Sequence, residues 1–224
     1  MIAGSRRLTG APKGVALVCA LAFAMACAMA AAAPSAASKP GEAVAPCEAC
    51  HGAHGEGMAA AHVPRIAGQS AQYLKKQLDD YADGTRDNPV MRNFAKALSD
   101  QQRSTLAARY AVMPATPRPQ AASPRPQTTA LDAVQQARGH QLAYQGDEQR
   151  RVAACNSCHG PDGVGVLHAA PYLAGQSADY LTSALKSFQQ DTRRNDAGEL
   201  MRSVAKQLDD ADIAAISGYF SSIQ

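Results

Sequence analysis

The chain has 224 residues, of which 18% are charged and 5% are aromatic, with no tryptophan. This length accommodates one or two domains. The formal net charge is +3, and the whole excess comes from Arg6, Arg7 and Lys13. Because the rest of the chain is formally neutral, its charge balance gives no support to a nucleic-acid-binding function.

The first 33 residues predict an export signal. A basic stretch precedes an unbroken apolar run over residues 15–33, which ends in small residues. This order is typical of a cleaved secretory signal peptide. The run is also long enough for a retained membrane anchor, although weakly hydrophobic alanine dominates it. We therefore expect an exported protein.

Four cysteines remain beyond this signal, and all of them lie in two Cys-x-x-Cys-His motifs. This motif is the attachment signature of c-type haem. Its two thiols lie one helical turn apart and add to the vinyl groups of one porphyrin, while the histidine supplies an axial nitrogen to the iron. We therefore predict two covalently bound haem c groups. The residues are Cys47, Cys50 and His51 for the first haem and Cys155, Cys158 and His159 for the second.

Zinc is the alternative use of four cysteines. Structural zinc sites, however, place their cysteine pairs closer together in the sequence than these two motifs are. A zinc site would also leave the repeated methionines described below without a role.

The first unit, residues 34–113, is predicted to be helical. Ser70 has the position of a helix N-cap, and Ser99 with Gln102 has the pattern of a capping box. Apolar residues follow both at helical spacing, which predicts two amphipathic helices. They are Leu74, Leu78 and Tyr81 in the first helix and Leu106 and Tyr110 in the second.

A proline-rich linker over residues 114–127 separates this unit from a second one, residues 128–224. The composition of the linker favours an extended, semi-rigid spacer. Neither unit contains a convincing strand pattern. The sequence therefore predicts an all-α protein with two tandem domains and no significant β-sheet.

The second unit begins with a predicted helix over residues 128–144. Its apolar side contains Leu131, Val134 and Leu142, and Gly139 weakens it. Ser177 is the predicted N-cap of the next helix. The apolar residues of the helices that follow are Leu181, Leu185, Phe188, Ile213, Ile216, Phe220 and Ile223.

The two units are copies of one another. Residues 64–74 match residues 171–181, and both segments contain Pro-x-x-Ala-Gly-Gln-Ser. Further along, Met91 and the arginine that follows it match Met201 and the arginine that follows it. The second copy carries a three-residue insertion just before its methionine.

This duplication selects the sixth iron ligands. Met201 is the only methionine of the second unit, and its match in the first unit is Met91 rather than Met58 or Met113. A thioether is a soft ligand, so His/Met ligation raises the reduction potential. The alternative is that these are core methionines. The predicted axial pairs are His51 with Met91 and His159 with Met201.

Two further pairs of residues occur in both copies, and each pair has two possible roles. Pro64 and Pro171 follow the haem motifs, and their carbonyls could accept the second ring N–H of each histidine; they could equally be loop prolines. Arg86 and Arg193 could pair with haem propionates or lie in solvent. The remaining histidines have no repeat partner and are predicted at the surface. They are His54, His62, His140 and His168.

Together these motifs resemble the dihaem cytochrome c4 family of bacterial periplasms, over nearly all of the chain beyond the signal. The resemblance implies two class I cytochrome c folds related by pseudo-twofold symmetry, with haem propionate edges approaching each other. It implies a periplasmic electron carrier that is often associated with the membrane. Its partners would be a respiratory donor, such as a cytochrome-reducing complex or a dehydrogenase, and a terminal oxidase.

One feature departs from that family. A helix normally precedes each haem motif, but Pro40 and Pro46 leave little room for one before the first motif. We therefore predict that the first domain is the less stable one, with weaker amide protection at Leu106 than at Ile216.

We expect no substrate chemistry in this chain, because a methionine in both copies closes both irons to small molecules. The alternative is a cytochrome subunit of a periplasmic dehydrogenase complex. A dihaem peroxidase is less favoured, since it requires one open iron position.

Overall fold

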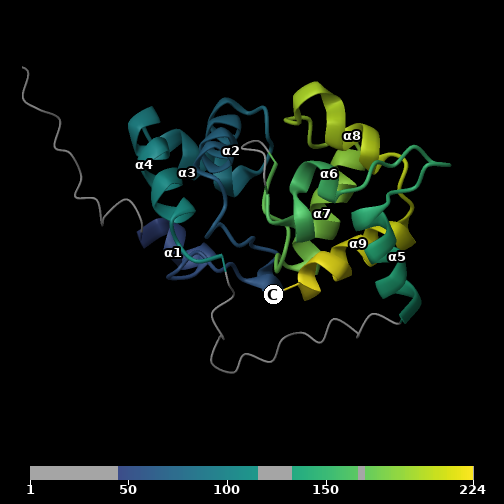
Figure 1. The fold of residues 1–224 in the computed structure, drawn as a ribbon. Helices are drawn as coiled ribbons and strands as arrows, with labels where there is room; N and C mark the ends of the chain where they lie inside the picture. The colour runs from purple at the N-terminus through teal and green to yellow at the C-terminus, as the bar shows by residue number, and fades with distance from the viewer. Residues whose placement is uncertain (1–44, 116–132, 166–169, 224) are drawn as a thin grey trace, which may run out of the picture. The chain divides into compact units, whose positions relative to one another are not determined.

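The structure is a computed structural model that describes residues 45–115, 133–165 and 170–223 (Figure 1). All of them belong to one compact unit of the chain, residues 38–224. The expected signal peptide, most of the segment before the first haem motif and most of the predicted linker lie outside the described residues, as do the first five residues of the helix predicted over 128–144, which include Leu131. In the described part of the chain, no helix is both long and apolar enough to cross a membrane.

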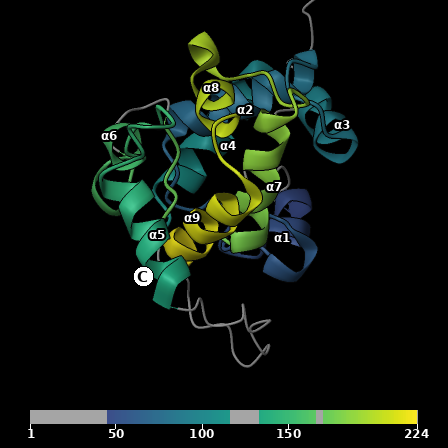
Figure 2. The same cartoon turned by 90° about the vertical axis from the view of Figure 1, so that its right-hand side faces the viewer.

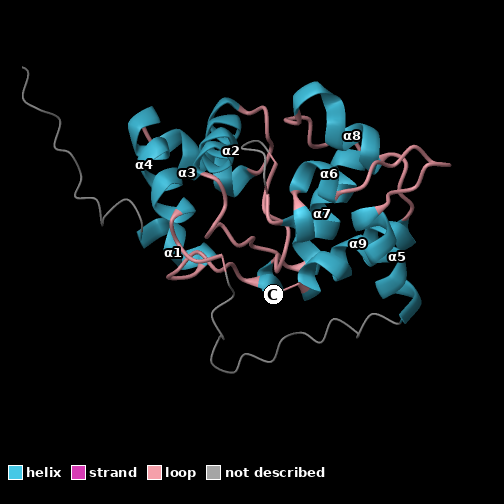
Figure 3. Cartoon of the chain, viewed as in Figure 1, coloured by secondary structure: helices cyan, strands magenta, loops and turns pink. Residues whose placement is uncertain are grey.

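The described residues form helices joined by loops (Figure 3). Their only extended pairings are two isolated bridges, Met58 with Val63 and Asp147 with Val152, so the all-α prediction is confirmed. The helices are α1 (Ala45–His51), α2 (Ala71–Asp83), α3 (Pro89–Ala97), α4 (Asp100–Ala111), α5 (Ala133–Tyr144), α6 (Asn156–His159), α7 (Ala178–Gln189), α8 (Leu200–Ala205) and α9 (Asp210–Ser222). Three short 3₁₀ turns accompany them: η1 (Ala59–Ala61), η2 (Pro161–Gly163) and η3 (Ala197–Glu199).

The duplication is visible in the order of these helices. The series α1 to α4, here called the first repeat, corresponds to α6 to α9, which together with α5 form the second repeat. The last helices are tied to their repeats in the same way. The Gly68 N–H donates to the Tyr110 carbonyl at 3.0 Å, and the Gly175 N–H donates to the Phe220 carbonyl at 2.8 Å. Tyr110 and Phe220 are therefore equivalent positions.

Helix starts lie where the sequence predicts them. The Ser70 and Ser177 side chains each accept a hydrogen bond from the backbone N–H three residues later. Ser99 opens α4 with the predicted capping box. A second capping box, formed by Asp209 and Asp212, opens α9. Each cap satisfies backbone donors that the first turn leaves unpaired.

Among the described residues each repeat has its own apolar core, and the core of the second repeat is the larger. The first core contains Leu74, Leu106, Ala107 and Tyr110, with Cys47, Ile66, Leu98 and Met113 packed against it. The second contains Leu142, Ala143, Val152, Leu181, Leu208, Ile213, Ile216, Tyr219 and Phe220. That the first domain is the less stable one stays a prediction, which amide exchange would test.

The helix before the second haem motif packs differently from the prediction. Leu142 is fully buried as expected, but Val134 is 78% exposed, so its placement on the apolar side was wrong. The buried face of α5 contains Gly139, Leu142 and Ala143 instead. This face lies along α9, and the two helices run side by side in both views (Figures 1 and 2).

Gly139 brings α5 close to α9 rather than merely weakening its own helix. A Cβ at this position would lie 2.5 Å from the Ala215 carbonyl oxygen and 2.6 Å from the Tyr219 Cβ. Alanine would gain about 0.5–1 kcal/mol of helix propensity, but overpacking a tight contact costs about 1–3 kcal/mol. We therefore expect Gly139→Ala to lower the free energy of unfolding, measured by denaturant titration. A stabilised variant would mean that the two helices can separate at no cost.

An ionic network also joins α5 to α9 and to the loop after α5. The Arg138 guanidinium donates to Asp147 and to Asp212, both at 2.8 Å, and Arg150 donates to Asp147 at 3.2 Å. The hydrogen bonds from Arg138 and Arg150 lower the pKa of Asp147 to about 2. The carboxylate therefore stabilises the fold at neutral pH.

The pH dependence of this contribution follows from the lowered pKa of Asp147. Stabilisation is complete above the pKa of an unfolded aspartate, about 3.9, and is lost as the pH falls through about 2. We expect Asp147→Asn to lower the urea midpoint at neutral pH, and we expect the difference from the wild type to shrink as the pH falls through about 2. A constant difference across this range would assign the effect to packing rather than charge.

Candidate functional site

Each Cys-x-x-Cys-His motif lies on a short helix. In the first repeat, α1 contains both cysteines and ends at His51. In the second, Cys155 is the N-cap of α6, which contains Cys158 and ends at His159. Both histidines are buried, with 8% and 7% of their surface exposed. The local fold therefore brings two sulfurs and an imidazole together in each repeat, as one haem c requires.

The two prolines hold these histidines in place. His51 Nδ1 lies 2.8 Å from the Pro64 carbonyl oxygen, and His159 Nδ1 lies 3.0 Å from that of Pro171. Since a carbonyl only accepts, Nδ1 must carry the proton, which leaves Nε2 unprotonated and able to bind iron. The sequence left open whether these prolines accept a hydrogen bond from the histidines or are ordinary loop residues. The structure contains the hydrogen bond in both repeats.

Burial also favours the neutral form that a metal ligand needs. It lowers the pKa of His51 and of His159, and the hydrogen bonds to the proline carbonyls offset this only in part. Neutral imidazole is the form that ligates a metal.

The first cysteine of each motif differs from the reactive thiol of a redox dithiol. Burial raises the pKa of Cys47, and it raises that of Cys155 to about 11, whereas catalytic Cys-x-x-Cys thiols have a lowered pKa. Across residues 45–115, 133–165 and 170–223, the structure contains no disulfide at these cysteines and no cluster of three or more residues suited to a metal ion. The raised pKa of Cys47 and of Cys155 argues against thiol exchange, and the two cysteines and the histidine of each repeat match the attachment motif of haem c.

The candidate methionines occupy matching helices. Met91 lies in the first turn of α3, after the N-cap Asn88, and Met201 is the second residue of α8. Both are half-buried. Met113 packs against the core of the first repeat and Met58 is 38% exposed. These positions leave Met91 as the methionine that repeats, and its role as a ligand remains a prediction.

Because of the insertion before Met201, the segment that precedes α8 differs from the segment that precedes α3. The insertion falls in the segment that contains η3 and ends at α8. Arg202 then pairs with Asp196 at 2.8 Å, where Arg92 pairs with Asp87 at 3.0 Å in the first repeat. The arginine after each methionine thus pairs with an aspartate that precedes its helix, and the insertion changes only the segment through which the chain reaches α8.

Arg86 and Arg193 are buried between the repeats, each with 9% of its surface exposed. Both donate to the Gln77 side-chain oxygen, at 2.6 and 3.1 Å. Arg86 also donates to the Tyr180 hydroxyl and Arg193 to that of Tyr73, in each case across the two repeats. The interpretation of these arginines as solvated residues is therefore wrong.

These two guanidiniums have only neutral acceptors among the described residues, where neither forms a salt bridge. A buried charge without a counter-ion is costly. The carboxylates of haem propionates are anions that would compensate this pair, so the arginines also fit the cofactor that the cysteines and histidines indicate.

Three histidines confirm the surface prediction. His54, His62 and His140 are exposed, and His140 stacks on Tyr144 with ring centroids 4.7 Å apart. His168 lies outside the described residues.

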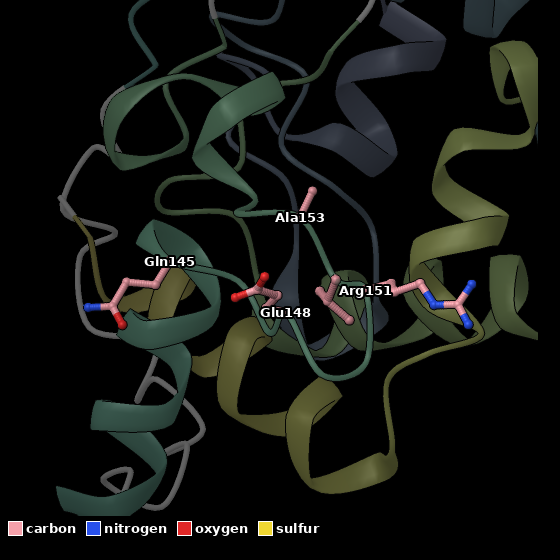
Figure 4. Close-up of a pocket in the computed structure, with 5 residues that line it drawn as sticks. Gln145, Glu148, Arg151 and Ala153 are labelled. Atoms are coloured by element: carbon pink, nitrogen blue, oxygen red, sulfur yellow. The ribbon is translucent and has the colours of Figure 1, made fainter.

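A shallow pocket elsewhere involves none of these groups. It is lined by Gln145, Glu148, Arg151, Val152 and Ala153 in the loop after α5. Figure 4 shows the Gln145 and Arg151 side chains pointing in opposite directions rather than into a common site. The pocket therefore has no convergent polar groups that would bind a substrate.

Comparison with known proteins agrees with this arrangement. A family model described as cytochrome c matches residues 38–108 and again residues 136–224. The protein is therefore a cytochrome c that contains two copies of the domain. Cytochrome c4 of Pseudomonas aeruginosa is 37% identical over 80% of this chain and 84% of its own. The crystal structure of reduced cytochrome c4 from Pseudomonas stutzeri aligns with a TM-score of 0.72 and 32% identity, over 83% of this chain and 96% of that one.

The chain belongs to the dihaem cytochrome c4 family, and it is an electron carrier with two covalently bound haem c groups. Two other similar proteins have names connected with thiosulfate. The thiosulfate dehydrogenase electron acceptor of Stutzerimonas stutzeri is 41% identical over 79% of this chain and 78% of its own. The structure of thiosulfate dehydrogenase TsdBA from Marichromatium purpuratum aligns with a TM-score of 0.70 and 34% identity, and this chain spans 36% of its length.

Proposed function

We propose that the four motif cysteines attach the haems and that a histidine and a methionine bind each iron. The observation that supports this most directly is the repeated hydrogen bond from the axial histidine to the proline carbonyl. Bound in this way, haem c supplies a one-electron iron couple. The residues are Cys47, Cys50, His51 and Met91 in a domain of residues 34–113, and Cys155, Cys158, His159 and Met201 in a domain of residues 128–224.

The surrounding residues then have defined roles. The Pro64 and Pro171 carbonyls fix the histidine rings and keep their second nitrogen unprotonated. Arg86 and Arg193 compensate propionate charge between the repeats. With both iron positions filled by protein ligands, the chain exchanges electrons and binds no substrate at iron, so we infer that it is not itself an enzyme.

We further propose that the protein works in the periplasm, exported by its first 33 residues, and passes single electrons from a donor towards a terminal oxidase. Its similarity to a protein named as the electron acceptor of thiosulfate dehydrogenase supports a dehydrogenase of this type as the donor. Peripheral association with the membrane is compatible with this role.

The second candidate is a permanent cytochrome subunit of a dehydrogenase complex. The specific observation in its favour is the likeness to the TsdBA structure, in which this chain spans only part of a longer one. In that case the catalytic chemistry would lie on residues that this chain does not contain.

Two measurements on the purified protein test the proposal. A pyridine haemochrome spectrum is expected to count two covalent haems per chain. Thiosulfate alone is expected to leave the oxidised protein unchanged, whereas thiosulfate with a thiosulfate dehydrogenase is expected to reduce it. Reduction by thiosulfate alone would make the chain an enzyme, and stable co-purification with a dehydrogenase would favour the subunit. Turnover of hydrogen peroxide would instead indicate a peroxidase.

A further inference from the structure

Two glutamines at equivalent repeat positions bind the main chain of the opposite repeat. The Gln69 side chain donates to the Tyr172 carbonyl and accepts from the Tyr172 N–H, both at 2.8 Å. The Gln176 side chain accepts from the Arg65 N–H at 2.9 Å and donates to the Arg65 carbonyl at 3.0 Å. Both side chains are 3% exposed. The contacts are therefore reciprocal and shielded from water.

The peptide that each glutamine binds is the one that also binds a haem-motif histidine. In the first repeat this is the peptide between Pro64 and Arg65. Its N–H donates to Gln176, and its carbonyl accepts from His51 Nδ1 at 2.8 Å. A single planar group thus connects His51 to a side chain of the second repeat.

The second repeat contains the mirror arrangement. The peptide between Pro171 and Tyr172 donates its N–H to Gln69, and its carbonyl accepts from His159 Nδ1 at 3.0 Å. Each histidine is therefore linked, through one peptide, to the glutamine of the other repeat.

Such a chain of hydrogen bonds transmits polarisation. An acceptor at the N–H end of a peptide increases the negative charge on its carbonyl oxygen, and this strengthens the second hydrogen bond by roughly 10–30%. A stronger acceptor at Nδ1 makes the imidazole a more basic ligand. A more basic ligand stabilises ferric iron and lowers the reduction potential.

We propose that Gln69 and Gln176 are positioning residues that tune the axial histidine of the opposite haem. Gln69 acts on His159, and Gln176 acts on His51. The inference rests on the proposed roles of these histidines as iron ligands. It gives each repeat control over the potential of the other, through groups that also hold the repeats together.

The alternative is that the glutamines only fasten the repeats. Fastening and tuning differ in which histidine responds to a substitution. Loss of a fastening contact loosens both repeats, whereas loss of the peptide link changes the hydrogen bond of one histidine, in the repeat that was not mutated.

The test uses Gln69→Met and Gln176→Met in the full chain, with both haems attached. In the reduced, diamagnetic protein, the ring Nδ1 proton resonance of each histidine reports its hydrogen bond. We expect Gln69→Met to move the His159 resonance upfield and leave that of His51 unchanged, with the reverse for Gln176→Met. The reduction potential of the affected haem is expected to rise.

Tyr172→Leu is the matched control. It removes the Tyr172 ring, which packs against the Arg65 guanidinium at 4.6 Å across the repeats, but it retains the backbone N–H and carbonyl that bind Gln69. Both histidine resonances are expected to stay in place. If a methionine variant does not fold, Gln69→Asn, which keeps a polar side chain one methylene shorter, is expected to shift His159 in the same direction.

The outcomes separate this inference from the proposed function. Fewer than two covalent haems, or histidine ring protons without the shift caused by a haem ring current, would overturn both. Two normal haems with a shift at the histidine of the mutated repeat, an equal shift at both or no shift would overturn the cross-repeat link alone.

Discussion

Replacement of Met201 by alanine is expected to lower the reduction potential of the second haem and to let carbon monoxide bind its reduced iron. The thioether is a soft ligand that favours ferrous iron, and axial ligands set haem potentials over a span of roughly 0.8 V. The change should therefore be among the largest that a single substitution can cause here. Spectroelectrochemical titration and the weak near-red band of Met-ligated ferric haem measure it.

The duplication provides an internal comparison for this prediction. Met91→Ala is expected to have the same effect on the first haem and none on the second. Met113→Leu is the matched control, because Met113 packs against the core of the first repeat. Carbon monoxide binding by the Met113 variant, with none by the Met91 variant, would show that the repeat alignment selects the wrong ligand.

Features governed by neighbouring residues could be predicted from the sequence. The caps at Ser70, Ser99 and Ser177 depend on backbone groups only three residues away, and all three are confirmed. The proline contacts required more, since Pro64 acts on a histidine 13 residues earlier. The repeat identified the two prolines as equivalent residues. It could not decide whether their carbonyls accept a hydrogen bond from the histidines or whether they are ordinary loop residues.

Features governed by the packing of the repeats could not be predicted. Arg86 and Arg193 have charged side chains typical of the surface, yet burial between the repeats surrounds them with neutral oxygens. The side chains of Gln69 and Gln176 bind main chain more than 100 residues away, and the sequence marks them only as repeated. No pattern within one unit specifies a partner in the other.

The helix before the second motif illustrates the same limit. Helical periodicity placed Val134 on the buried face and treated Gly139 as a weakness. The structure exposes the valine and uses the glycine for close contact with α9. Periodicity gives the spacing of an apolar face, but the neighbouring helix determines which face is buried.

Phe220→Ala is expected to destabilise the second repeat by about 3–5 kcal/mol, the usual cost of removing a buried phenylalanine. Phe220 is 2% exposed in the larger of the two cores, and its ring packs edge-on against Tyr219 at 5.5 Å. The cavity would open between α9 and the segment around Gly163. This segment lies close to the Phe220 ring, because a Cβ added at Gly163 would be only 2.7 Å from it. Denaturant unfolding with the haems attached measures the total loss.

Amide exchange shows which helices lose protection in the Phe220→Ala variant. The matched variant is Tyr110→Ala, at the equivalent position of the first repeat. If the repeats unfold separately, Phe220→Ala speeds exchange in α5 and α9 and leaves α2 and α4 protected, while Tyr110→Ala does the reverse. In the wild type, Leu106 should then exchange faster than Ile216, because the first core is smaller. Equal loss of protection in both repeats would mean instead that the buried polar contacts between them, including Gln69 and Gln176, make the two repeats one cooperative unit.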